Sequence, residues 1–322
     1  MNLYKVEFVC ESRVNRLPDA QTVFGSLCQI LKSIYGESSL EEYLHSFDSE
    51  PWLIHSSMYP EKLYPMIKKS LYSVGIVNHL VKNAEPQDQL KALSDCKKYK
   101  KIRYISEKLF QDYILSDQSN KLNQDIMETM ERFNLENNIL QYSDENLDFK
   151  SETKLSTRVT IDKMDRAEGK ERSLFYDTDL FLEPGQKLYM LVRSSKPIEE
   201  LEQLFSWVDY FPMGKRGSTG KNLFRYLGVK QIQERSNAKY KILLSKCLPQ
   251  EDDFVMEKSY YTYTTAMYRS AKAYQNHIIG TIRKIDEGSL MYTQEQKPYY
   301  GKVLPIQGEQ GIIYHYGIGF VI

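Results

Sequence analysis

Alternation of apolar and polar positions opens the chain and predicts a strand over residues 2–10. Helical spacing follows, because apolar residues recur three and four positions apart after Asp19, a residue type that caps helix starts. Gly36 is of the type that often ends a helix, so we expect a helix between these two residues. The apolar run of residues 51–56 predicts a second strand. The chain therefore begins with the order strand, helix, strand.

A long β-hairpin is predicted at about 154–177, because alternation returns on both sides of a charged stretch that contains Gly169. Residues 187–193 form an apolar run typical of a strand, and Pro197 stands at the favoured first position of a helix. A glycine-rich segment and a strand at 223–231 complete the series. The order β-α-β, hairpin, β-α, loop, β is that of a ferredoxin-like unit.

Beyond residue 233 we expect mostly strands, at 240–244, 260–268, 278–285 and 312–322. We interpret them as a second, degenerate and β-rich copy of the same unit. The predicted fold class is therefore α+β, with two ferredoxin-like (RRM-like) modules at 1–232 and 233–322. The polar stretch of about 61–150 is interpreted as a helical insertion into the first module.

Charge changes this picture only locally. The 322 residues contain 43 Lys and Arg against 43 Asp and Glu, so a globally basic nucleic-acid-binding chain is excluded. Residues 111–150, however, hold nine acids and three bases, which leaves 40 bases against 34 acids elsewhere. Without the acidic insertion the body is moderately basic, a balance that permits RNA binding without indicating it.

Several classes of protein are made improbable by what the sequence lacks. No run of eighteen apolar residues predicts a membrane span, and Glu7 interrupts the place where a signal peptide would need an apolar stretch. The four cysteines, Cys10, Cys28, Cys96 and Cys247, do not have metal-ligand spacing. We therefore expect a cytoplasmic protein with reduced thiols, no bound metal and no cofactor.

The sharpest local signal is a glycine-rich loop at 214–220. Glycine lets the backbone approach a phosphate closely, and the loop combines glycines with bases and hydroxyls but no acid. Its spacing fits neither a Walker A loop nor a dinucleotide-binding fingerprint. The alternative is a flexible connection with incidental lysines. The residues predicted to bind phosphate are Lys215, Arg216, Gly217, Ser218, Thr219, Gly220 and Lys221.

Two other basic stretches are candidates. On the hairpin, Arg158 and Thr160 are expected on one strand face, suited to a polynucleotide backbone, with Lys163 and Arg166 further along. Acids within the hairpin equally favour a solvated element with internal ion pairs. Residues 97–104 contain five bases and two tyrosines, which could follow a nucleic-acid strand but more often form a solvated face.

Catalytic motifs are weak. The five histidines show no zinc-protease pattern, and no nucleophile elbow or carboxylate cluster appears. A metal-independent ribonuclease that uses His55 or His315 with Lys215 stays possible, since such cleavage needs only an acid and a base. A lone histidine on a strand is more often a structural residue. We expect no enzyme activity.

Together these motifs resemble a known family. The Leu17-Pro18-Asp19 opening, the hairpin with Thr157-Arg158-Val159-Thr160-Ile161-Asp162 and Leu174-Phe175-Tyr176, and the loop Gly214–Gly220 come in the order of the RAMP superfamily of CRISPR-associated proteins. Within it, the chain is most similar to the subunit that holds the crRNA 5′ handle in type III-A (Csm) effector complexes. The likeness spans nearly the whole chain except the insertion.

The resemblance implies a non-catalytic, handle-binding subunit of a hetero-oligomeric complex. It also implies that the hairpin is a protruding thumb, and that the partners are crRNA, the large polymerase-like subunit and a backbone RAMP subunit. Three alternatives stay open: a crRNA-processing endoribonuclease of the same superfamily, the equivalent type III-B subunit, and a scaffold that binds only proteins.

Overall fold

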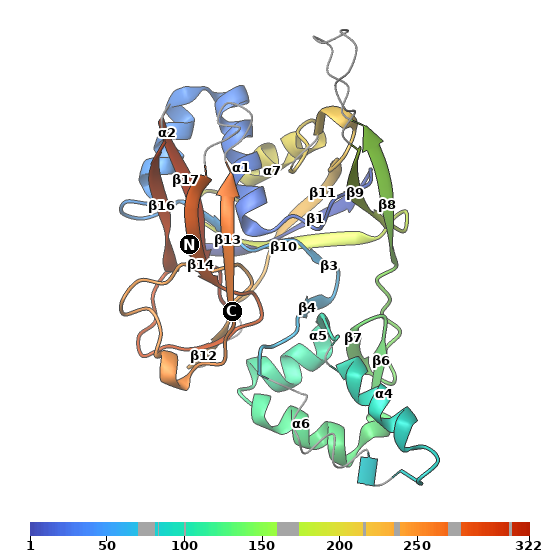
Figure 1. The fold of residues 1–322 in the computed structure, drawn as a ribbon. Helices are drawn as coiled ribbons and strands as arrows, with labels where there is room; N and C mark the ends of the chain where they lie inside the picture. Colours follow the sequence, from blue (N-terminus) through green and yellow to red (C-terminus); the bar gives the residue numbers. More distant parts are fainter. Residues whose placement is uncertain are drawn as a thin grey trace.

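The computed structural model describes residues 1–69, 81–82, 84–99, 101–159, 174–214, 217–234, 239–269, 278–308 and 311–322. Its centre is an antiparallel sheet with the strand order β11-β1-β10-β2, in which β3 also pairs with β10 (Figure 1). The bounds of these strands are β1 (Asn2–Cys10), β2 (Leu53–His55), β3 (Tyr59–Pro60), β10 (Lys187–Ser194) and β11 (Phe224–Gln231). The predicted strands at 2–10, 51–56, 187–193 and 223–231 are therefore confirmed.

Helices cover one side of this sheet. They are α1 (Ala20–Ile30), the π-helical turn η1 (Leu31–Tyr35), α2 (Glu37–Ser46), α7 (Ile198–Ser206) and the 3-10 turn η4 (Trp207–Asp209) (Figure 1). Asp19 caps α1 as expected, because its carboxylate accepts a hydrogen bond from the Thr22 amide at 3.0 Å. Phe8 of β1 meets Phe205 of α7 edge to face, at 6.4 Å between ring centroids. Pro197 is the N-cap of α7 rather than its first helical residue.

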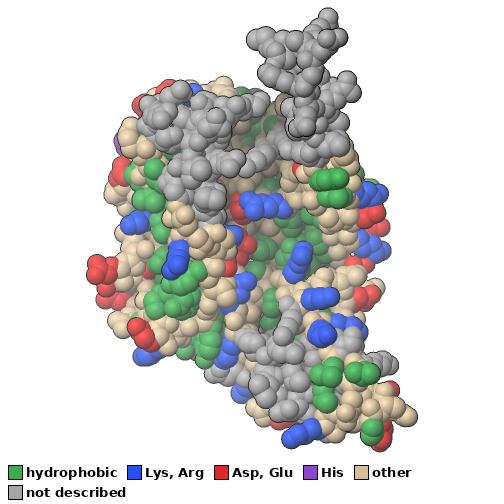
Figure 2. Space-filling model, in the orientation of Figure 1, with side chains coloured by type: hydrophobic (Ala, Val, Ile, Leu, Met, Phe, Trp, Pro, Cys, Tyr) green, Lys and Arg blue, Asp and Glu red, His purple; other side chains and the backbone are tan. Residues whose placement is uncertain are grey.

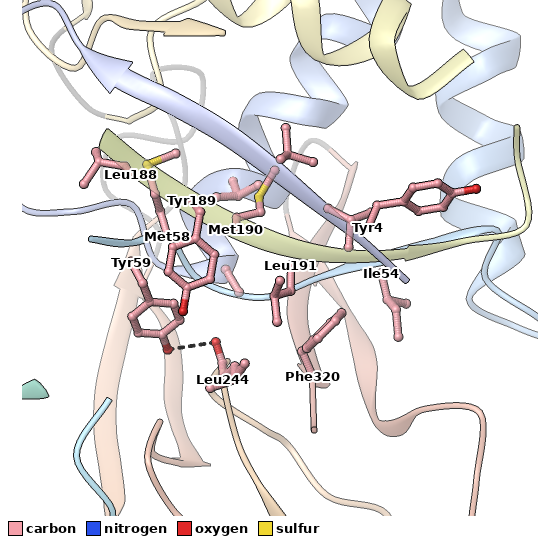
Figure 3. Packing of buried hydrophobic residues seen from close by; sticks show 14 of the residues in the cluster. Tyr4, Ile54, Met58, Tyr59, Leu188, Tyr189, Met190, Leu191, Leu244 and Phe320 are labelled. Carbon is pink, nitrogen blue, oxygen red and sulfur yellow. Dashed lines mark hydrogen bonds between the residues drawn. The ribbon is translucent and has the colours of Figure 1, made fainter. Parts of the chain in front are cut away.

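The C-terminal segment covers the other side of the sheet. Figure 3 shows Leu244 beside Tyr59, and Phe320 on the same side of β10 as Leu191. The Tyr59 hydroxyl donates a hydrogen bond to the Leu244 carbonyl at 2.9 Å. Buried side chains from both ends of the chain thus form one continuous core.

The described residues of 61–150 form a lobe at the bottom of Figure 1 that is only partly helical. The expectation of a helical insertion needs correction, because the lobe also holds a four-stranded sheet of order β4-β5-β7-β6. Its strands have three or four residues, too few to show alternation in the sequence. The elements are β4 (Leu63–Pro65), α4 (Gln89–Tyr99), β5 (Tyr104–Ser106), α5 (Glu107–Leu109), the π-helical η2 (Phe110–Leu115), α6 (Ser119–Glu128), η3 (Met130–Arg132), β6 (Phe133–Glu136) and β7 (Ile139–Tyr142).

The predicted hairpin consists of β8 (Ser151–Val159) and β9 (Leu174–Leu182), on the right of Figure 1. Its register runs from Ser151 opposite Leu182 to Val159 opposite Leu174. The candidates Thr160, Lys163 and Arg166 lie outside the described residues.

The last part of the chain is rich in β-structure, as expected. Its strands form the antiparallel pairs β12–β15, β13–β14 and β16–β17, and no α-helix occurs in the described part of residues 239–322. Among all described residues, no helix is long and apolar enough to cross a membrane. The bounds are β12 (Tyr240–Ile242), the 3-10 turn η6 (Met256–Lys258), β13 (Tyr263–Arg269), β14 (Ile278–Ile285), β15 (Leu290–Tyr292), β16 (Tyr300–Gly308) and β17 (Gly311–Gly319).

Candidate nucleic-acid interface

The glycine-rich loop leads from α7 and η4 to β11. Gly217–Thr219 form a 3-10 turn (η5), which the Gly220 amide closes by donating to the Gly217 carbonyl at 2.9 Å. Gly220 has φ +72°, in the left-handed region that favours glycine. The side chains of Ser218 and Thr219 are exposed. Four of the predicted phosphate-binding residues thus form one tight turn, whereas Lys215 and Arg216 lie outside the described residues.

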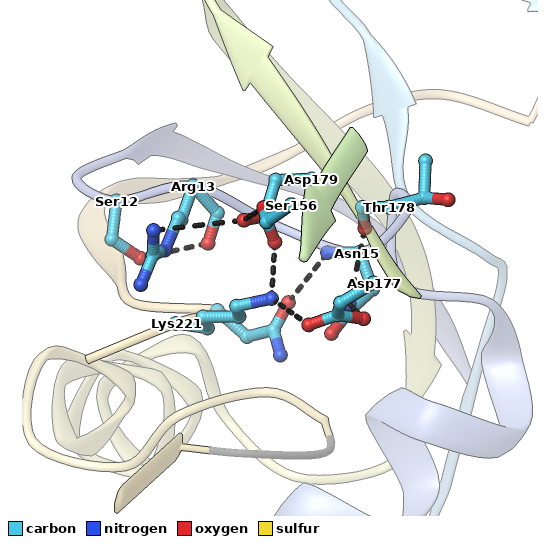
Figure 4. Close-up of polar contacts among 9 residues, drawn as sticks. Ser12, Arg13, Asn15, Ser156, Asp177, Thr178, Asp179 and Lys221 are labelled. Carbon is cyan, nitrogen blue, oxygen red and sulfur yellow. Dashed lines mark hydrogen bonds and ion pairs between the residues drawn. The ribbon is translucent and has the colours of Figure 1, made fainter. Parts of the chain in front are cut away.

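Lys221 differs from the expectation of a phosphate-binding lysine on a hydrated loop. Its side chain is fully buried, and its ammonium group forms ion pairs with Asp177 and Asp179 of β9 (Figure 4). The two acids are more than forty residues away in sequence, so the local composition of the loop could not reveal them. Lys221, predicted to bind phosphate, is instead buried in this structure, where it joins the loop to the hairpin.

Further polar groups complete this cluster. Arg13 reaches Asp179, with 3.6 Å between Nη1 and Oδ2, and the Ser156 hydroxyl donates to the same carboxylate at 2.8 Å. Burial alone would raise the pKa of Asp179, but the hydrogen bonds from Lys221 and Ser156, together with the charges of Lys221 and Arg13, lower it. Asp179 is therefore a carboxylate at neutral pH, held by groups from three segments of the chain.

Backbone hydrogen bonds also align the turn before α1 with the glycine-rich loop and with β9. The Asn222 amide donates to the Arg13 carbonyl at 3.0 Å, and Val14 and Leu180 exchange two hydrogen bonds at 2.9 and 2.7 Å. The Asn15 amide donates to the side-chain oxygen of Asn222 at 3.2 Å. Sequence reasoning missed this role of residues 12–16; the only available signal was the pair of arginines, Arg13 and Arg16, in the turn before α1.

A groove of about 670 Å³ lies between the hairpin, the inserted lobe and the C-terminal strands. Figure 2 shows Lys and Arg side chains gathered in the middle of this face. The described basic residues that line the groove are Arg16, Lys68, Arg103 and Lys246. The first three side chains are exposed, so they can reach a ligand. Among the described bases of the stretch 97–104, Arg103 lines the groove, together with Ile102 and Tyr104.

Acids also line the groove, but each has a partner within the protein. Asp19 caps α1 and pairs with Arg16, and Asp286 accepts hydrogen bonds from two threonines. Glu287 accepts a hydrogen bond from Ser57. Burial raises the pKa of Glu287, although this hydrogen bond acts in the opposite direction. Arg16, Lys68 and Arg103 are exposed, whereas these three acids and Lys246 are half-buried.

One face of the hairpin forms a wall of the groove. Thr153 and Thr178 line it, and Leu155, directly opposite Thr178, is 68% exposed on the same face. Tyr176, two residues from Thr178, is 67% exposed. Tyr176 lies beyond the residues that line the groove, on the same face of the hairpin, and an exposed aromatic ring can stack on a base. Arg158 lies at the end of β8, opposite Phe175.

Both candidate catalytic histidines, His55 and His315, are buried. His55 is fully buried, and its ring stacks on that of Tyr316 at 4.5 Å between centroids. Burial lowers the pKa of His55 to about 4, and burial together with the charge of Lys284 lowers the pKa of His315 to about 4. Neither lines the groove. The described residues contain no cluster of His, Cys, Asp and Glu that could hold a metal ion.

Comparison with known proteins gives a likeness of fold. No family model and no curated protein sequence matches the chain. A chain in the crystal structure of a Csm3–Csm4 subcomplex of the type III-A CRISPR-Cas interference complex aligns with TM-score 0.60 and 15% identity, over 100% of this chain and 98% of that chain. A chain of a Csm1–Csm4 cassette in complex with pppApA aligns with TM-score 0.56 and 15% identity, over 100% and 97%. The chain therefore has the fold of a subunit of type III-A (Csm) complexes, as its resemblance to the RAMP superfamily led us to expect.

Proposed function

We propose that this chain is a non-catalytic, RNA-binding subunit of a type III-A CRISPR interference complex, and that it binds the 5′ handle of crRNA in the groove beside the hairpin. It contacts the large polymerase-like subunit, the counterpart of Csm1, and a backbone RAMP subunit, the counterpart of Csm3. The observation that carries the proposal is the fold likeness over the full length to chains of the Csm1–Csm4 and Csm3–Csm4 structures.

The topology supports two finer parts of the proposal. The antiparallel order β11-β1-β10-β2, with α1 after β1 and α7 after β10, agrees with a ferredoxin-like first module. The hairpin β8–β9 leaves the body of the molecule beside the groove, in keeping with a thumb. We infer the β-rich second module at 233–322 from the same superfamily likeness.

The groove supports binding of a single-stranded nucleic acid. Basic side chains from four separate segments line it, an arrangement that suits a backbone passing several of them. The threonines of the hairpin offer hydroxyl donors on one wall, and the exposed Tyr176, further along the same face of the hairpin, offers a stacking surface. Most RNA-binding affinity of such a groove comes from its charges, so it depends steeply on salt.

The absence of catalysis is proposed from the state of the histidines. Cleavage of RNA without metal needs a base and an acid within reach of one phosphate. The side chains of His55 and His315 are buried, and a pKa of about 4 leaves both neutral and without a proton to donate as imidazolium near pH 7. We expect purified protein to leave repeat-containing RNA intact, with or without magnesium. Cleavage that disappears in His55→Ala or His315→Ala would favour the processing enzyme instead.

The binding test combines three substitutions, Arg16→Ala, Lys68→Ala and Arg103→Ala, in the assembled complex. Each exposed cation that neutralises a phosphate adds about 0.7 to the slope of log K against log salt on a single strand. We expect weaker binding of a handle-bearing RNA and a slope reduced by up to about 2, measured by filter binding at a series of salt concentrations.

The matched control removes three exposed cations that do not line the groove: Lys32, Arg225 and Lys230. Affinity and slope should stay close to those of the unmodified protein. A slope that is unchanged in the groove variant, or reduced equally in both variants, would contradict the proposed site. If the large subunit did not copurify with the unmodified chain, the proposed assembly would be contradicted.

A further inference from the structure

The hairpin β8–β9 has little apolar packing to hold its direction. Along β8, every described side chain from Ser151 to Thr157 is exposed except that of Ser156, which is half-buried. On β9, Leu180 and Leu182 are half-buried and pack against the edge of the core, and the fully buried residue among those described is a charged one, Asp179. A hairpin of two strands is at most marginally stable in water without such support. Besides the contacts of these two leucines, its direction is therefore set by polar contacts at its base.

Those contacts form a charge-balanced cluster of four groups from three segments. Lys221 belongs to the glycine-rich loop, Asp177 and Asp179 belong to β9, and Arg13 belongs to the turn before α1 (Figure 4). Ser156 connects the cluster to β8 as well. Both strands of the hairpin are thus bound to the same ammonium-centred network.

Buried ion pairs seldom add much stability, because the cost of removing the charges from water offsets most of their attraction. They do require particular geometry, since a charge displaced from its partners is left buried and unpaired. Lys221 can satisfy both carboxylates only while β9 crosses the end of the glycine-rich loop at its present position. The cluster therefore suits the role of fixing an angle better than that of adding stability.

We propose that Lys221 is a positioning residue that holds hairpin β8–β9 at a fixed angle to the glycine-rich loop. The consequence for RNA rests on the proposed function: contacts made by the loop and contacts made by the hairpin stay a fixed number of nucleotides apart. The lysine itself touches no RNA in this arrangement. It acts through the two carboxylates at the base of the hairpin.

The first test measures the hairpin's direction without RNA. Spin labels are introduced through p-acetylphenylalanine at Leu155 of β8 and at Glu202 of α7, both exposed, and double electron–electron resonance gives their distance distribution. We expect a narrow distribution in the unmodified protein and one at least twice as wide in Lys221→Met. The matched control is Lys154→Met, which removes an exposed lysine of the same hairpin and should leave the width unchanged.

A second variant covers the case in which Lys221→Met does not fold. Asp177→Asn removes one of the two carboxylates and leaves Asp179 to hold the lysine. It should give an intermediate width, at an unchanged far-UV circular dichroism spectrum. A narrow distribution in Asp177→Asn, or in a folded Lys221→Met, overturns the proposal.

The second test is a hydroxyl-radical footprint of a handle-bearing RNA in the assembled complex. In Lys221→Met we expect protection near the loop to persist, whereas protection at the hairpin shifts or spreads over neighbouring nucleotides. Absence of any footprint with the unmodified protein would contradict the proposed function, and the spin-label distances would still decide the positioning role. A footprint identical in Lys221→Met and unmodified protein overturns the positioning role alone.

Discussion

Gly301 lies where the backbones of β16 and β17 and of residues 247–248 come closest together. It has φ +77°, and a Cβ added there would lie 2.2 Å from the Gly317 carbonyl oxygen and 2.9 Å from the Cys247 sulfur. The Gly317 carbonyl belongs to the paired strands β16 and β17, so it cannot move away without disturbing their register. Only glycine satisfies both the left-handed backbone and the close approach.

Gly301→Ala should therefore destabilise the protein by about 2–4 kcal/mol through backbone strain and overpacking. Gly25 provides the matched control, since it is exposed in α1, and a Cβ there meets nothing within 4 Å. Gly25→Ala should stabilise by roughly 0.5–1 kcal/mol. Urea denaturation of the two variants measures both effects. Equal shifts of the two urea midpoints in the same direction would show that a Cβ is tolerated at position 301.

His55 makes stability depend on pH. Burial lowers its pKa to about 4, against the opposing hydrogen bond with the Ser56 carbonyl, whereas the unfolded chain has a value near 6.5. Between these pH values the imidazole of His55 is protonated in the unfolded state and neutral in the folded state. Above about pH 6.5 this titration does not affect the free energy of unfolding. As the pH falls from there toward 4, the free energy of unfolding decreases by up to about 1.4 kcal/mol per pH unit.

Substitution of His55 by Gln should flatten that dependence. Urea denaturation at several values between pH 4 and 7 should give a slope smaller by up to one proton in the variant, even if its stability at pH 7 is lower. His315 has a similarly lowered pKa and leaves part of the slope in place. Parallel curves for the two proteins would contradict the assignment to His55.

At the scale of elements, the inserted lobe is part of the fold's core. Within the lobe, Tyr64 of β4 stacks on Phe110 of η2 at 4.0 Å between centroids, and Tyr64 also meets Tyr189 of β10 in the central sheet at 5.9 Å. Phe110→Ala should cost about 3–5 kcal/mol, the usual range for a buried aromatic residue. Leu90→Ala in the same lobe is the control, because Leu90 is 81% exposed and should change stability little. Thermal unfolding followed by circular dichroism compares them, and a Phe110→Ala midpoint equal to that of the control would argue for a loosely attached lobe.

The elements that could be predicted from sequence are those whose own residues carry a clear period. In α1 and α7 the buried positions recur every three to four residues, and in β1 and β11 they alternate over part of the strand, whereas β10 is recognisable as a continuous apolar run. By contrast α2 buries only Tyr43 among its described side chains, so its sequence shows no apolar stripe. The short strands of the lobe and β15 have too few residues for a pattern.

The candidate site, likewise, could be predicted only where the local sequence itself carried a signal. A glycine-rich turn follows from local composition, because glycine is needed for its left-handed backbone. The burial of Lys221 depends on Asp177 and Asp179, which reach it only through tertiary folding. The groove likewise collects Arg16, Lys68, Arg103 and Lys246 from segments that no local motif connects.

For the whole molecule, the continuous core predicts cooperative unfolding. Both tryptophans, Trp52 and Trp207, precede residue 233, so their fluorescence reports the first part, whereas far-UV circular dichroism reports all of it. Because Phe320 and Leu244 belong to the core of the central sheet, the two signals should give coincident urea curves. Phe320→Ala should shift both curves equally, and Ile312→Ala, at a position 52% exposed, should shift neither. Two separated transitions would contradict a shared core.

The position of β1 in the middle of the sheet has a consequence during synthesis. Its neighbours are encoded late: Asn2 pairs with Ser194, and Tyr4 with Gln231. At roughly 5–20 residues per second, a ribosome takes on the order of ten seconds or more to deliver them. Throughout that delay both edges of β1 offer unpaired backbone groups to other chains. The yield of this subunit in a cell therefore depends on how well the nascent chain is shielded, and fragments that end before residue 187 leave β1 permanently without either neighbour.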